Sequence, residues 1–328
     1  MLLDGRKAPS IQRAAEALAA GELVGLPTET VYGLGARADD DAAVARIFAA
    51  KGRPADHPLI VHVADPADAR AFASHWPPVA ERLAAALWPG PLTIIVPRAP
   101  HMAAAAAGGQ SSVGLRCPGH PVAQALLRAA RERGVPGVAA PSANRFGGVS
   151  PTRAQHVVDE FPGSGLLVLD GGACDVGIES SIVDCSRGQP VLLRPGLLTR
   201  QQLEDAAGEP LHDRDAGAPR ASGTLEAHYA PRAKVRLMPA AMLKTALSVL
   251  DGAGPPLAVY CRTVPRQAAV SVRYRAMPGQ PAQAAHDLFN ALRELDAEGV
   301  HLIWVEEPPA GPEWDGIRDR LQRAAASA

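Results

Sequence analysis

Two basic side chains lie two positions apart in the stretch KGRPADHPLIVHV, which spans residues 51–63. Because glycine at position 52 lets the backbone turn, Lys51 and Arg53 can converge on one anion, and both side chains keep their charge at neutral pH. Cations at a helix end also stabilise the helix dipole without any ligand, so helix capping is an equally good interpretation. The sequence contains no GxxxxGK[ST] motif, so a nucleoside triphosphate bound here is not held by a Walker loop.

Three further stretches place polar side chains where apolar runs end: PTETVYGLGA at 27–36, APSANRFGGVSPT at 140–152 and IESSIVDCSRGQPVLLRPG at 178–196. The second offers hydroxyls, an amide and backbone N–H groups just before a helix, which is typical of an anion or nucleotide site. Tight turns with side-chain caps and a hairpin with polar ends explain the same residues without a ligand. Residues 33–38 match GxGxxA, but the helix that should open on a dinucleotide fingerprint begins instead at the aspartates that follow.

The elements that must position these side chains follow from the apolar periodicity. Helices are predicted where apolar residues recur every three to four positions, at 39–51, 77–88, 120–134 and 152–161. Strands are predicted at 23–26, 59–63, 92–96, 113–116, 138–140, 166–169, 181–184 and 191–193. This alternation predicts an α/β domain, and its sheet should be mixed because several late strands lie too close together for crossover helices.

The composition changes at residue 208. Residues 208–233 have no sustained apolar period and are rich in Gly, Pro and Ala, as expected of a linker or an active-site loop. Strands are then predicted at 234–238, 257–261, 270–275 and 301–305, and helices at 240–252, 282–299 and 314–326. We therefore predict a first α/β domain at 1–207 that carries the polar clusters described above, a linker or lid at 208–233 and a smaller Rossmann-like α/β domain at 234–328.

The whole-chain composition excludes several classes of protein. The 328 residues carry a formal net charge of -1, with 47% hydrophobic and 20% charged residues, which is ordinary for a soluble globular protein. A protein that binds mainly to phosphate backbones would be more basic. No segment is long and apolar enough for a membrane span, and the N-terminal stretch lacks the apolar core of a signal peptide, so a cytoplasmic protein is expected. The four cysteines form no CxxC pair and are predicted to be reduced core residues.

Taken together, six motifs in one order resemble the YrdC-like threonylcarbamoyl-AMP synthases. They are PTETVYGLGA, KGRPADHPLIVHV, SSVGLRCPGHP, APSANRFGGVSPT, IESSIVD and LLRPG. HYAP at 228–231 and the second α/β unit resemble the longer, two-domain branch of that family. A single such motif would mean little, whereas six in order are specific.

The resemblance implies a nucleotidyltransferase with a YrdC-like twisted mixed sheet. It would join L-threonine, bicarbonate or CO2, and ATP, with Mg²⁺ on the phosphates, into threonylcarbamoyl-adenylate for modification of the tRNA adenosine beside the anticodon. Lys51 and Arg53 would be the catalytic residues. By similarity, the ATP-binding residues would be Lys51, Arg53, His57, Ser112, Ser142, Asn144, Ser150 and Arg194, with His228 and Tyr229 from the lid. Threonine would be held by Thr30, His62, Arg116, Ser180 and the backbone of Ala140.

The implied partners are downstream threonylcarbamoyl transferase proteins and, through them or directly, tRNA. Two other classes of protein share some of these sequence features. A non-catalytic module of the same fold would bind double-stranded RNA, but the near-neutral charge and the complete set of site residues argue against it. A nicotinamide oxidoreductase rests on the GxGxxA match alone. No metal held by the protein itself is expected.

Overall fold

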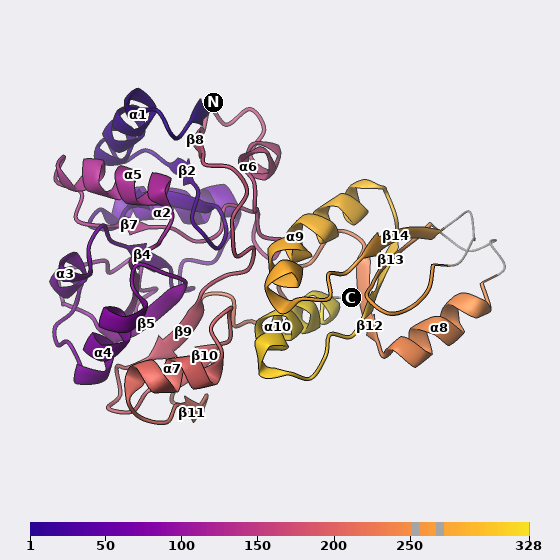
Figure 1. Ribbon diagram of the computed structural model, residues 1–328. Coiled ribbons are helices and arrows are strands. Elements are labelled where there is room, and N and C mark those ends of the chain that lie inside the picture. The colour runs from indigo at the N-terminus through magenta and orange to yellow at the C-terminus, as the bar shows by residue number, and fades with distance from the viewer. Residues whose placement is uncertain (251–255, 267–271, 328) are drawn as a thin grey trace. The chain divides into compact units, whose positions relative to one another are not determined.

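The computed structural model describes residues 1–250, 256–266 and 272–327. These residues form two compact units (Figure 1). The first comprises 1–146 and 150–224, and the second comprises 147–149 and 225–328. Residues 208–224, part of the compositional linker, thus belong to the first unit. We describe each unit by itself.

The first unit is built on one large mixed sheet, with the strand order β1-β8-β2-β3-β7-β4-β6-β5-β9-β10-β11. The strands are β1 (Leu2–Asp4), β2 (Val24–Leu26), β3 (Gly33–Arg37), β4 (Ile60–His62), β5 (Leu92–Pro97), β6 (Ser112–Arg116), β7 (Val138–Ala139), β8 (Leu167–Asp170), β9 (Ser181–Asp184), β10 (Val191–Arg194) and β11 (His212–Asp213). The helices are α1 (Ala8–Ala19), α2 (Asp41–Lys51), α3 (Pro66–Ala69), α4 (Pro78–Leu87), α5 (Pro121–Arg131), α6 (Ala154–Glu160) and α7 (Arg200–Ala207), with a 3-10 turn η1 (Arg70–Phe72).

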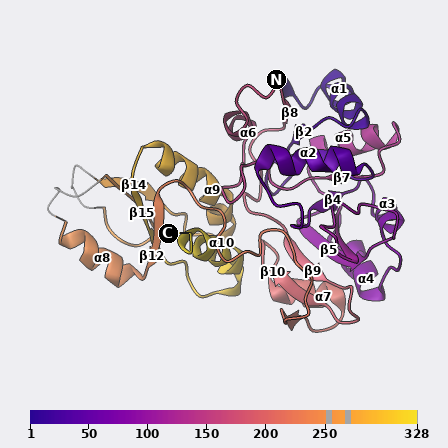
Figure 2. The ribbon, with the colours of Figure 1, turned by 180° about the vertical axis from the view of Figure 1, so that it is seen from behind.

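Both faces of this sheet are covered, and the strand residues alternate between two apolar cores. Val168 of β8 belongs to the larger core, which is formed with α2, α4, α6 and α7, whereas its neighbours Leu167 and Leu169 belong to a second core formed with α1 and α5. Figure 2 shows α2 in front of the sheet with α1 and α5 behind it. Strands buried on both sides are rigid supports, so side chains at their ends are held firmly in place.

The second unit contains a four-stranded parallel sheet in the order β12-β15-β13-β14. Its strands are β12 (Lys234–Met238), β13 (Leu257–Cys261), β14 (Val272–Ala276) and β15 (Leu302–Glu306), and its helices are α8 (Ala240–Ser248), α9 (Pro281–Ala297) and α10 (Asp315–Ala325), preceded by the 3-10 turn η2 (Pro312–Trp314). Helices α9 and α10 lie on one side of the sheet and α8 on the other (Figure 1). This arrangement confirms the predicted Rossmann-like α/β unit.

One carboxylate closes the carboxyl edge of this second sheet. Glu306, the last residue of β15, is 1% exposed and accepts hydrogen bonds from the backbone N–H groups of Arg262, Thr263 and Val264 at 2.7, 2.7 and 3.3 Å. Those amides follow directly on β13. Burial raises the pKa of Glu306, but the hydroxyl and backbone N–H of Thr263 and the neighbouring amides outweigh burial and lower it.

The predicted mixed sheet and the predicted strands and helices of the first unit are confirmed, but several elements were missed. Six elements were not predicted from the sequence: β1, β3, β11, α1, α3 and α7. The stretch GLGAR was interpreted as a turn, whereas it forms strand β3. A Cβ on Gly35 would lie 2.8 Å from both Leu26 Cδ2 and Val138 Cγ1, so glycine is needed here for close packing in a strand. The dinucleotide-fingerprint interpretation is wrong for the same reason.

In the second unit, helix α8 ends at Ser248, and residues 251–252 of the predicted helix lie outside the described residues. Residues 270–271 of the predicted strand at 270–275 also lie outside them, and β14 begins at Val272. The four cysteines are buried and free, as predicted. No helix among the described residues is long and apolar enough to cross a membrane.

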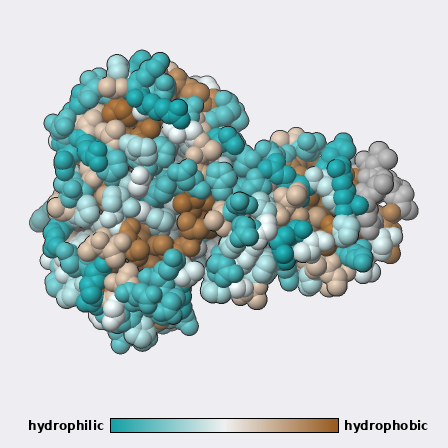
Figure 3. All heavy atoms as spheres, in the orientation of Figure 1, coloured by the Kyte–Doolittle hydropathy of each residue, from teal (hydrophilic) through white to brown (hydrophobic). Residues whose placement is uncertain are grey.

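The surface in Figure 3 is mostly hydrophilic, with smaller apolar areas between the charged side chains. Among the described residues, the large apolar side chains that are more than a third exposed are Met1, Leu2, Leu225, Met242 and Val249.

Candidate active site

Two of the predicted threonine-binding residues meet at the carboxyl ends of adjacent strands. His62 ends β4 and Arg116 ends β6, and because these strands are parallel the two residues are register partners. Thr30 comes from the PTET loop between β2 and β3, and its hydroxyl accepts a hydrogen bond from Arg116 Nη1 at 2.8 Å. The structure therefore brings Thr30, His62 and Arg116 together, although 86 positions separate the first and last in sequence.

Arg116 is only 3% exposed and is fixed through each of its three nitrogens. Nε donates to the carbonyl of Gly90 at 3.2 Å, Nη1 donates to Thr30, and Nη2 lies 2.7 Å from Glu29 Oε1 in an ion pair. Burial raises the pKa of Glu29, but the nearby charge of Arg116, with poorly aligned contacts from its guanidinium and from nearby amides, outweighs burial and lowers the pKa. Glu29 is therefore ionised at neutral pH, and the Glu29–Arg116 pair has no net charge.

His62 is a neutral imidazole in this setting. Burial lowers its pKa to about 3, and the nearby charge of Arg116 adds to the shift. Its side chain can therefore exchange hydrogen bonds with a ligand at neutral pH, but it carries no positive charge there.

Lys51 ends helix α2, which begins after the N-cap Asp40. Its Nζ donates to the carbonyl of Ser142 at 2.6 Å and also to the carbonyl of Asn144. The carbonyls in the last turn of α2 accept instead from the backbone N–H groups of Gly52 and Arg53, with Gly52 at a φ of 65°. The structure thus disfavours helix capping as the role of the Lys51 ammonium and directs it to the segment after β7.

Burial strongly affects this lysine, which is 2% exposed. Desolvation lowers the pKa of Lys51 well below its ordinary value, and the nearby guanidinium of Arg53 lowers it further. An incoming phosphate would offset both effects, because negative charge stabilises the ammonium form.

Arg53 and His57 surround one aromatic ring. The Arg53 guanidinium lies 5.8 Å from the centre of the Phe146 ring, and the His57 ring lies edge-on at 5.3 Å. Arg53 Nη2 donates to the carbonyl of Pro58 at 2.9 Å. Lys51, Arg53, His57 and Phe146 are therefore neighbours in the first unit, as expected if the first three share one ligand.

The segment that carries Ser142, Asn144 and Ser150 is held against the PTET loop. The N–H of Ala143 donates to the carbonyl of Tyr32, and the N–H of Tyr32 donates to the carbonyl of Pro151, both at 2.8 Å. Asn144 is 1% exposed and Ser150 is fully buried, with the Ser150 hydroxyl donating to Glu179.

The backbone of Ala140 enters the same region. Its N–H donates to the carbonyl of Ile60 at 2.9 Å, which places the end of β7 beside β4. The Ala140 carbonyl oxygen is therefore the backbone atom through which this residue would meet threonine, and its contact with a ligand stays a prediction.

Ser180 and Arg194 form a second polar group at β9 and β10. Arg194 Nε and Nη2 donate to the Ser180 carbonyl at 3.0 and 2.9 Å, and the Ser180 hydroxyl pairs with that of Thr93 at 2.8 Å. Ser180 was assigned to threonine and Arg194 to ATP, so this group would join the two parts of the site.

A segment of the compositional linker lies over three of the predicted ATP-binding residues. The Ser222 carbonyl accepts from Arg194 Nη1 at 2.7 Å, and its hydroxyl accepts from Arg53 Nη2 at 3.3 Å and donates to the Pro58 carbonyl at 2.8 Å. A residual void of about 10 Å³, lined by Ser112 among others, lies beneath it. Ser222 therefore accepts hydrogen bonds from Arg53 and Arg194, which are guanidinium donors that a bound triphosphate would need.

The predicted lid residues His228 and Tyr229 belong to the second unit. Their rings meet edge-on at 4.1 Å, and Tyr229 packs 5.4 Å from the ring of Phe289, with the Arg320 guanidinium 5.5 Å from its centre. Tyr229 is fully buried at a φ of 62°. These contacts give Tyr229 a packing role in its own unit, and nucleotide binding by His228 and Tyr229 stays a prediction.

Comparisons with known proteins agree along the whole chain. A family model described as "Telomere recombination", whose name joins Sua5, YciO and YrdC, matches residues 16–196, and a model described as "Threonylcarbamoyl-AMP synthase, C-terminal domain" matches residues 198–326. The chain is 38% identical to a threonylcarbamoyl-AMP synthase from Bacillus subtilis, over 97% of this chain and 93% of the relative. This chain belongs to the threonylcarbamoyl-AMP synthase family.

Other members of this family agree in sequence and in structure. The Pyrococcus abyssi threonylcarbamoyl-AMP synthase is 36% identical, over 96% of this chain and 94% of its own. The structure of a P. abyssi Sua5 variant matches with a TM-score of 0.90 at 34% identity, covering 100% of this chain and 96% of that chain. A P. abyssi Sua5 structure complexed with L-threonine matches with a TM-score of 0.88 at 35% identity, covering 97% and 94%.

Four residues at the candidate site of this family member were not predicted from the sequence. They are Glu29, Thr93, Phe146 and Ser222. Glu29 lies within the PTET motif, but nothing in the sequence assigned a role to its carboxylate. Thr93 lies within the apolar strand β5, and Ser222 lies in a stretch without apolar periodicity. Neither residue is part of a local sequence pattern that indicates a binding site.

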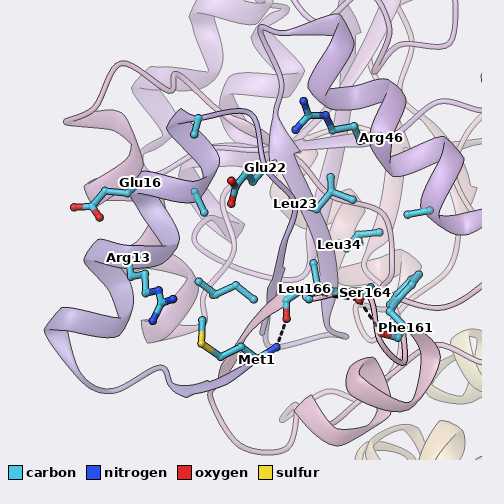
Figure 4. A pocket seen from close by; sticks show the side chains of 15 residues that line it. Met1, Arg13, Glu16, Glu22, Leu23, Leu34, Arg46, Phe161, Ser164 and Leu166 are labelled. Carbon is cyan, nitrogen blue, oxygen red and sulfur yellow. Dashed lines mark hydrogen bonds between the residues drawn. The ribbon is translucent and has the colours of Figure 1, made fainter.

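A separate pocket of about 630 Å³ lies elsewhere on the first unit. Figure 4 shows Arg13 and Glu16 of α1 and Arg46 of α2 around it, with Leu23 and Leu34 on its apolar side. Among the described residues that line it, none was predicted to bind threonine or ATP.

Proposed function

We propose that this protein joins L-threonine, bicarbonate or CO2, and ATP into L-threonylcarbamoyl-adenylate and pyrophosphate, as a nucleotidyltransferase. One observation carries the proposal: a buried group for a small amino acid, Arg116 with Thr30 and His62, occurs in the same unit as the cations Lys51 and Arg53. The relative solved with L-threonine supports an amino acid as the ligand of the first group.

The chemistry needs no nucleophile from the protein. The ammonium of threonine first loses a proton to solvent, and the neutral amine then attacks CO2 and releases a second proton to solvent, giving a carbamate. A carbamate oxygen then attacks the α-phosphorus of ATP, and pyrophosphate leaves. The tasks of the protein are to position the reactants and to stabilise charge on the phosphates. We assign the carboxylate of threonine to Arg116 and the phosphates to Lys51, Arg53 and Arg194, because guanidinium and ammonium groups match those anions.

Further contacts are proposed for the remaining predicted residues. On the nucleotide side these are His57, Ser112, Ser142, Asn144 and Ser150. On the threonine side they are Ser180, the backbone of Ala140 and the neutral imidazole of His62.

We propose that ATP brings Mg²⁺ with it. Among the described residues there is no group of three or more His, Cys, Asp or Glu side chains able to hold a metal. Mg²⁺ usually keeps several waters and is bound largely through substrate phosphates, so such a cluster is unnecessary. When bound, Mg²⁺ would neutralise negative charge on the phosphates.

The compositional linker is proposed to act as a lid. Ser222 occupies donors on Arg53 and Arg194, so ATP must compete for them when it binds. Changing Ser222 to Ala removes the hydroxyl contacts and leaves the carbonyl contact to Arg194. We expect a lower KM for ATP and more hydrolysis of the adenylate in this variant. An unchanged KM together with an unchanged product yield would contradict the lid.

The decisive experiment follows the product. Purified full-length protein is incubated with ATP, Mg²⁺, bicarbonate and labelled L-threonine, and the labelled adenylate and pyrophosphate are measured. Pyrophosphate release should require both threonine and bicarbonate, because the attacking oxygen exists only after the carbamate forms. An equal rate without threonine would refute the function. Serine should react more slowly, since one buried methyl group contributes about 1 to 3 kcal/mol to discrimination.

The adenylate is a labile mixed anhydride and must be passed to a transferase that modifies tRNA. We propose that this occurs in the cytoplasm, for threonylcarbamoyl modification of the adenosine beside the anticodon. Direct binding of tRNA is a separate question, which a titration of the protein with labelled tRNA at two salt concentrations would answer.

A further inference from the structure

Three buried side chains at the proposed threonine site, Glu29, Arg116 and His62, have polar atoms that make no hydrogen bond within the described residues. Among the described residues, neither oxygen of Glu29 has a well-aligned donor, and Arg116 Nη2 and His62 Nδ1 also lack a hydrogen-bond partner. Glu29 and Arg116 are nevertheless 2.7 Å apart, so they attract each other without forming an aligned hydrogen bond. Buried polar atoms without partners are rare in folded proteins, so several of them close together point to a role in binding a polar ligand.

The backbone holds Glu29 firmly in this position. Its carbonyl accepts from the N–H of Val176 at 2.7 Å. On one side, the Thr28 hydroxyl pairs with that of Thr30 at 2.9 Å and donates to the carbonyl of Val31 at 2.6 Å, which closes the PTET loop. The carboxylate thus enters the site from a fixed turn and not from a mobile side chain on the surface.

The charge of the site limits which ligand it can accept. Arg116 alone would attract any small carboxylate. With Glu29 beside it, the pair is neutral, and an added carboxylate would leave one uncompensated negative charge in a buried place, which is costly. A ligand that brings an ammonium together with its carboxylate avoids this cost. In an α-amino acid both groups are attached to one carbon, so they can reach two protein atoms that are 2.7 Å apart.

We propose that Glu29 is a substrate-binding residue that receives the α-ammonium of the amino acid while Arg116 receives its α-carboxylate. This inference rests on the proposed function and adds a specificity determinant to it. Glu29 selects the zwitterion and rejects hydroxy acids and other simple carboxylates of the same size. Because Arg116 lowers its pKa, Glu29 is ionised when it receives the ammonium, and the ammonium then loses a proton to solvent before the neutral amine attacks CO2.

The test compares two ligands with two proteins. Binding of L-threonine and of 3-hydroxybutyrate, which keeps the carboxylate, hydroxyl and methyl groups but lacks the amine, is measured by calorimetry on the full chain without ATP. In the wild type, threonine should bind at least about tenfold more tightly, as expected for a hydrogen bond to a charged group. In Glu29→Gln, the affinity for threonine should fall about tenfold or more, while 3-hydroxybutyrate should bind as tightly as in the wild type or more tightly.

A structural role predicts a different pattern. If Glu29 only orients Arg116, the affinities for both ligands fall by the same factor in Glu29→Gln, and the inference is overturned. Asp184→Asn is the matched control, since Asp184 is fully buried and pairs with Arg187 at 3.0 Å outside the site. Its ligand preference should equal that of the wild type.

The wild type alone provides a second test should Glu29→Gln fail to fold. Threonine, 3-hydroxybutyrate and 1-amino-2-propanol, which lacks the carboxylate, are compared on the unaltered protein. Both ligands with a single charge should bind at least about tenfold more weakly than threonine. If 3-hydroxybutyrate binds as tightly as threonine, Glu29 does not receive the ammonium. If the wild type binds no threonine and releases pyrophosphate without it, the proposed function fails instead.

Discussion

Replacing Lys51 by Met should separate catalysis from folding. Methionine keeps most of the apolar stem and removes the ammonium. In the folded protein that ammonium donates to the carbonyls of Ser142 and Asn144. An opposite charge about 4 Å away contributes roughly 4 kcal/mol at an effective dielectric constant near 20. Loss of one preorganised donor costs about 2 to 4 kcal/mol of transition-state stabilisation in comparable sites. We therefore expect turnover to fall about 30- to 1000-fold.

The effect of this change on stability should be much smaller. A buried acceptor left without its donor costs about 1 to 3 kcal/mol. Against this, the lowered pKa of Lys51 means that the folded state holds the proton less tightly than the unfolded state does. Below the unfolded-state pKa, the charged lysine therefore opposes folding, and removing it recovers that free energy. The two effects oppose each other, so the free energy of unfolding should change by less than about 2 kcal/mol.

The assay measures pyrophosphate release at saturating ATP, threonine and bicarbonate, alongside urea unfolding. Lys7→Met serves as the matched control, because the Lys7 side chain is 71% exposed. Arg53→Ala should lower turnover in the same way. Wild-type turnover in Lys51→Met with normal unfolding would refute the role in phosphate binding. A loss of folding that accounts for the lost activity would do so as well.

Three further outcomes are expected. His62, with a pKa of about 3 in the folded state, binds fewer protons than in the unfolded state at pH 3 to 6.5, so stability falls as pH falls through this range. Between pH 7 and pH 5 the wild type should therefore lose about 2 kcal/mol more than His62→Gln in urea unfolding, and parallel pH slopes would contradict this. Asn144→Ala should raise the KM for ATP more than that for threonine, and the reverse order would move Asn144 to the threonine side. Tyr229→Ala should cost about 3 to 5 kcal/mol of unfolding free energy and Tyr229→Phe about 1.5 kcal/mol or less, and equal costs would exclude ring packing.

Sequence patterns predicted the elements that are long, periodic and locally punctuated. Helix α2 has an aspartate N-cap, regular apolar spacing and a glycine at its end, and it lies as predicted. Helix α1 has the same spacing in Ile11, Ala14 and Leu18 and was missed although the signal was present. Strand β3 gave the opposite signal, because its two glycines, which are typical of turns, serve close packing between strands.

The candidate site shows the same division between local and long-range information. The types and spacing of Lys51 and Arg53 indicated anion binding from the sequence alone, whereas Arg116 was assigned through the resemblance to the family. Their surroundings depend on the order of strands in the sheet, which no local pattern contains. His62 and Arg116 become neighbours because β4 and β6 pair, although 53 residues separate them in sequence. The pairing of Glu29 with Arg116 depends on the same long-range order.

Glu306 gives the second unit an intramolecular ligand. In open parallel α/β sheets, the amides beyond the carboxyl ends of the strands are where the phosphates of a bound nucleotide usually meet the protein. Here the amides that follow β13 already surround a carboxylate from the adjacent strand β15. A tethered group competes with an effective concentration that reaches millimolar or higher, so a free phosphate would need considerable affinity to displace it. The Rossmann-like topology of this unit is thus no guide to nucleotide binding, because the chain itself fills the position that an anion would take.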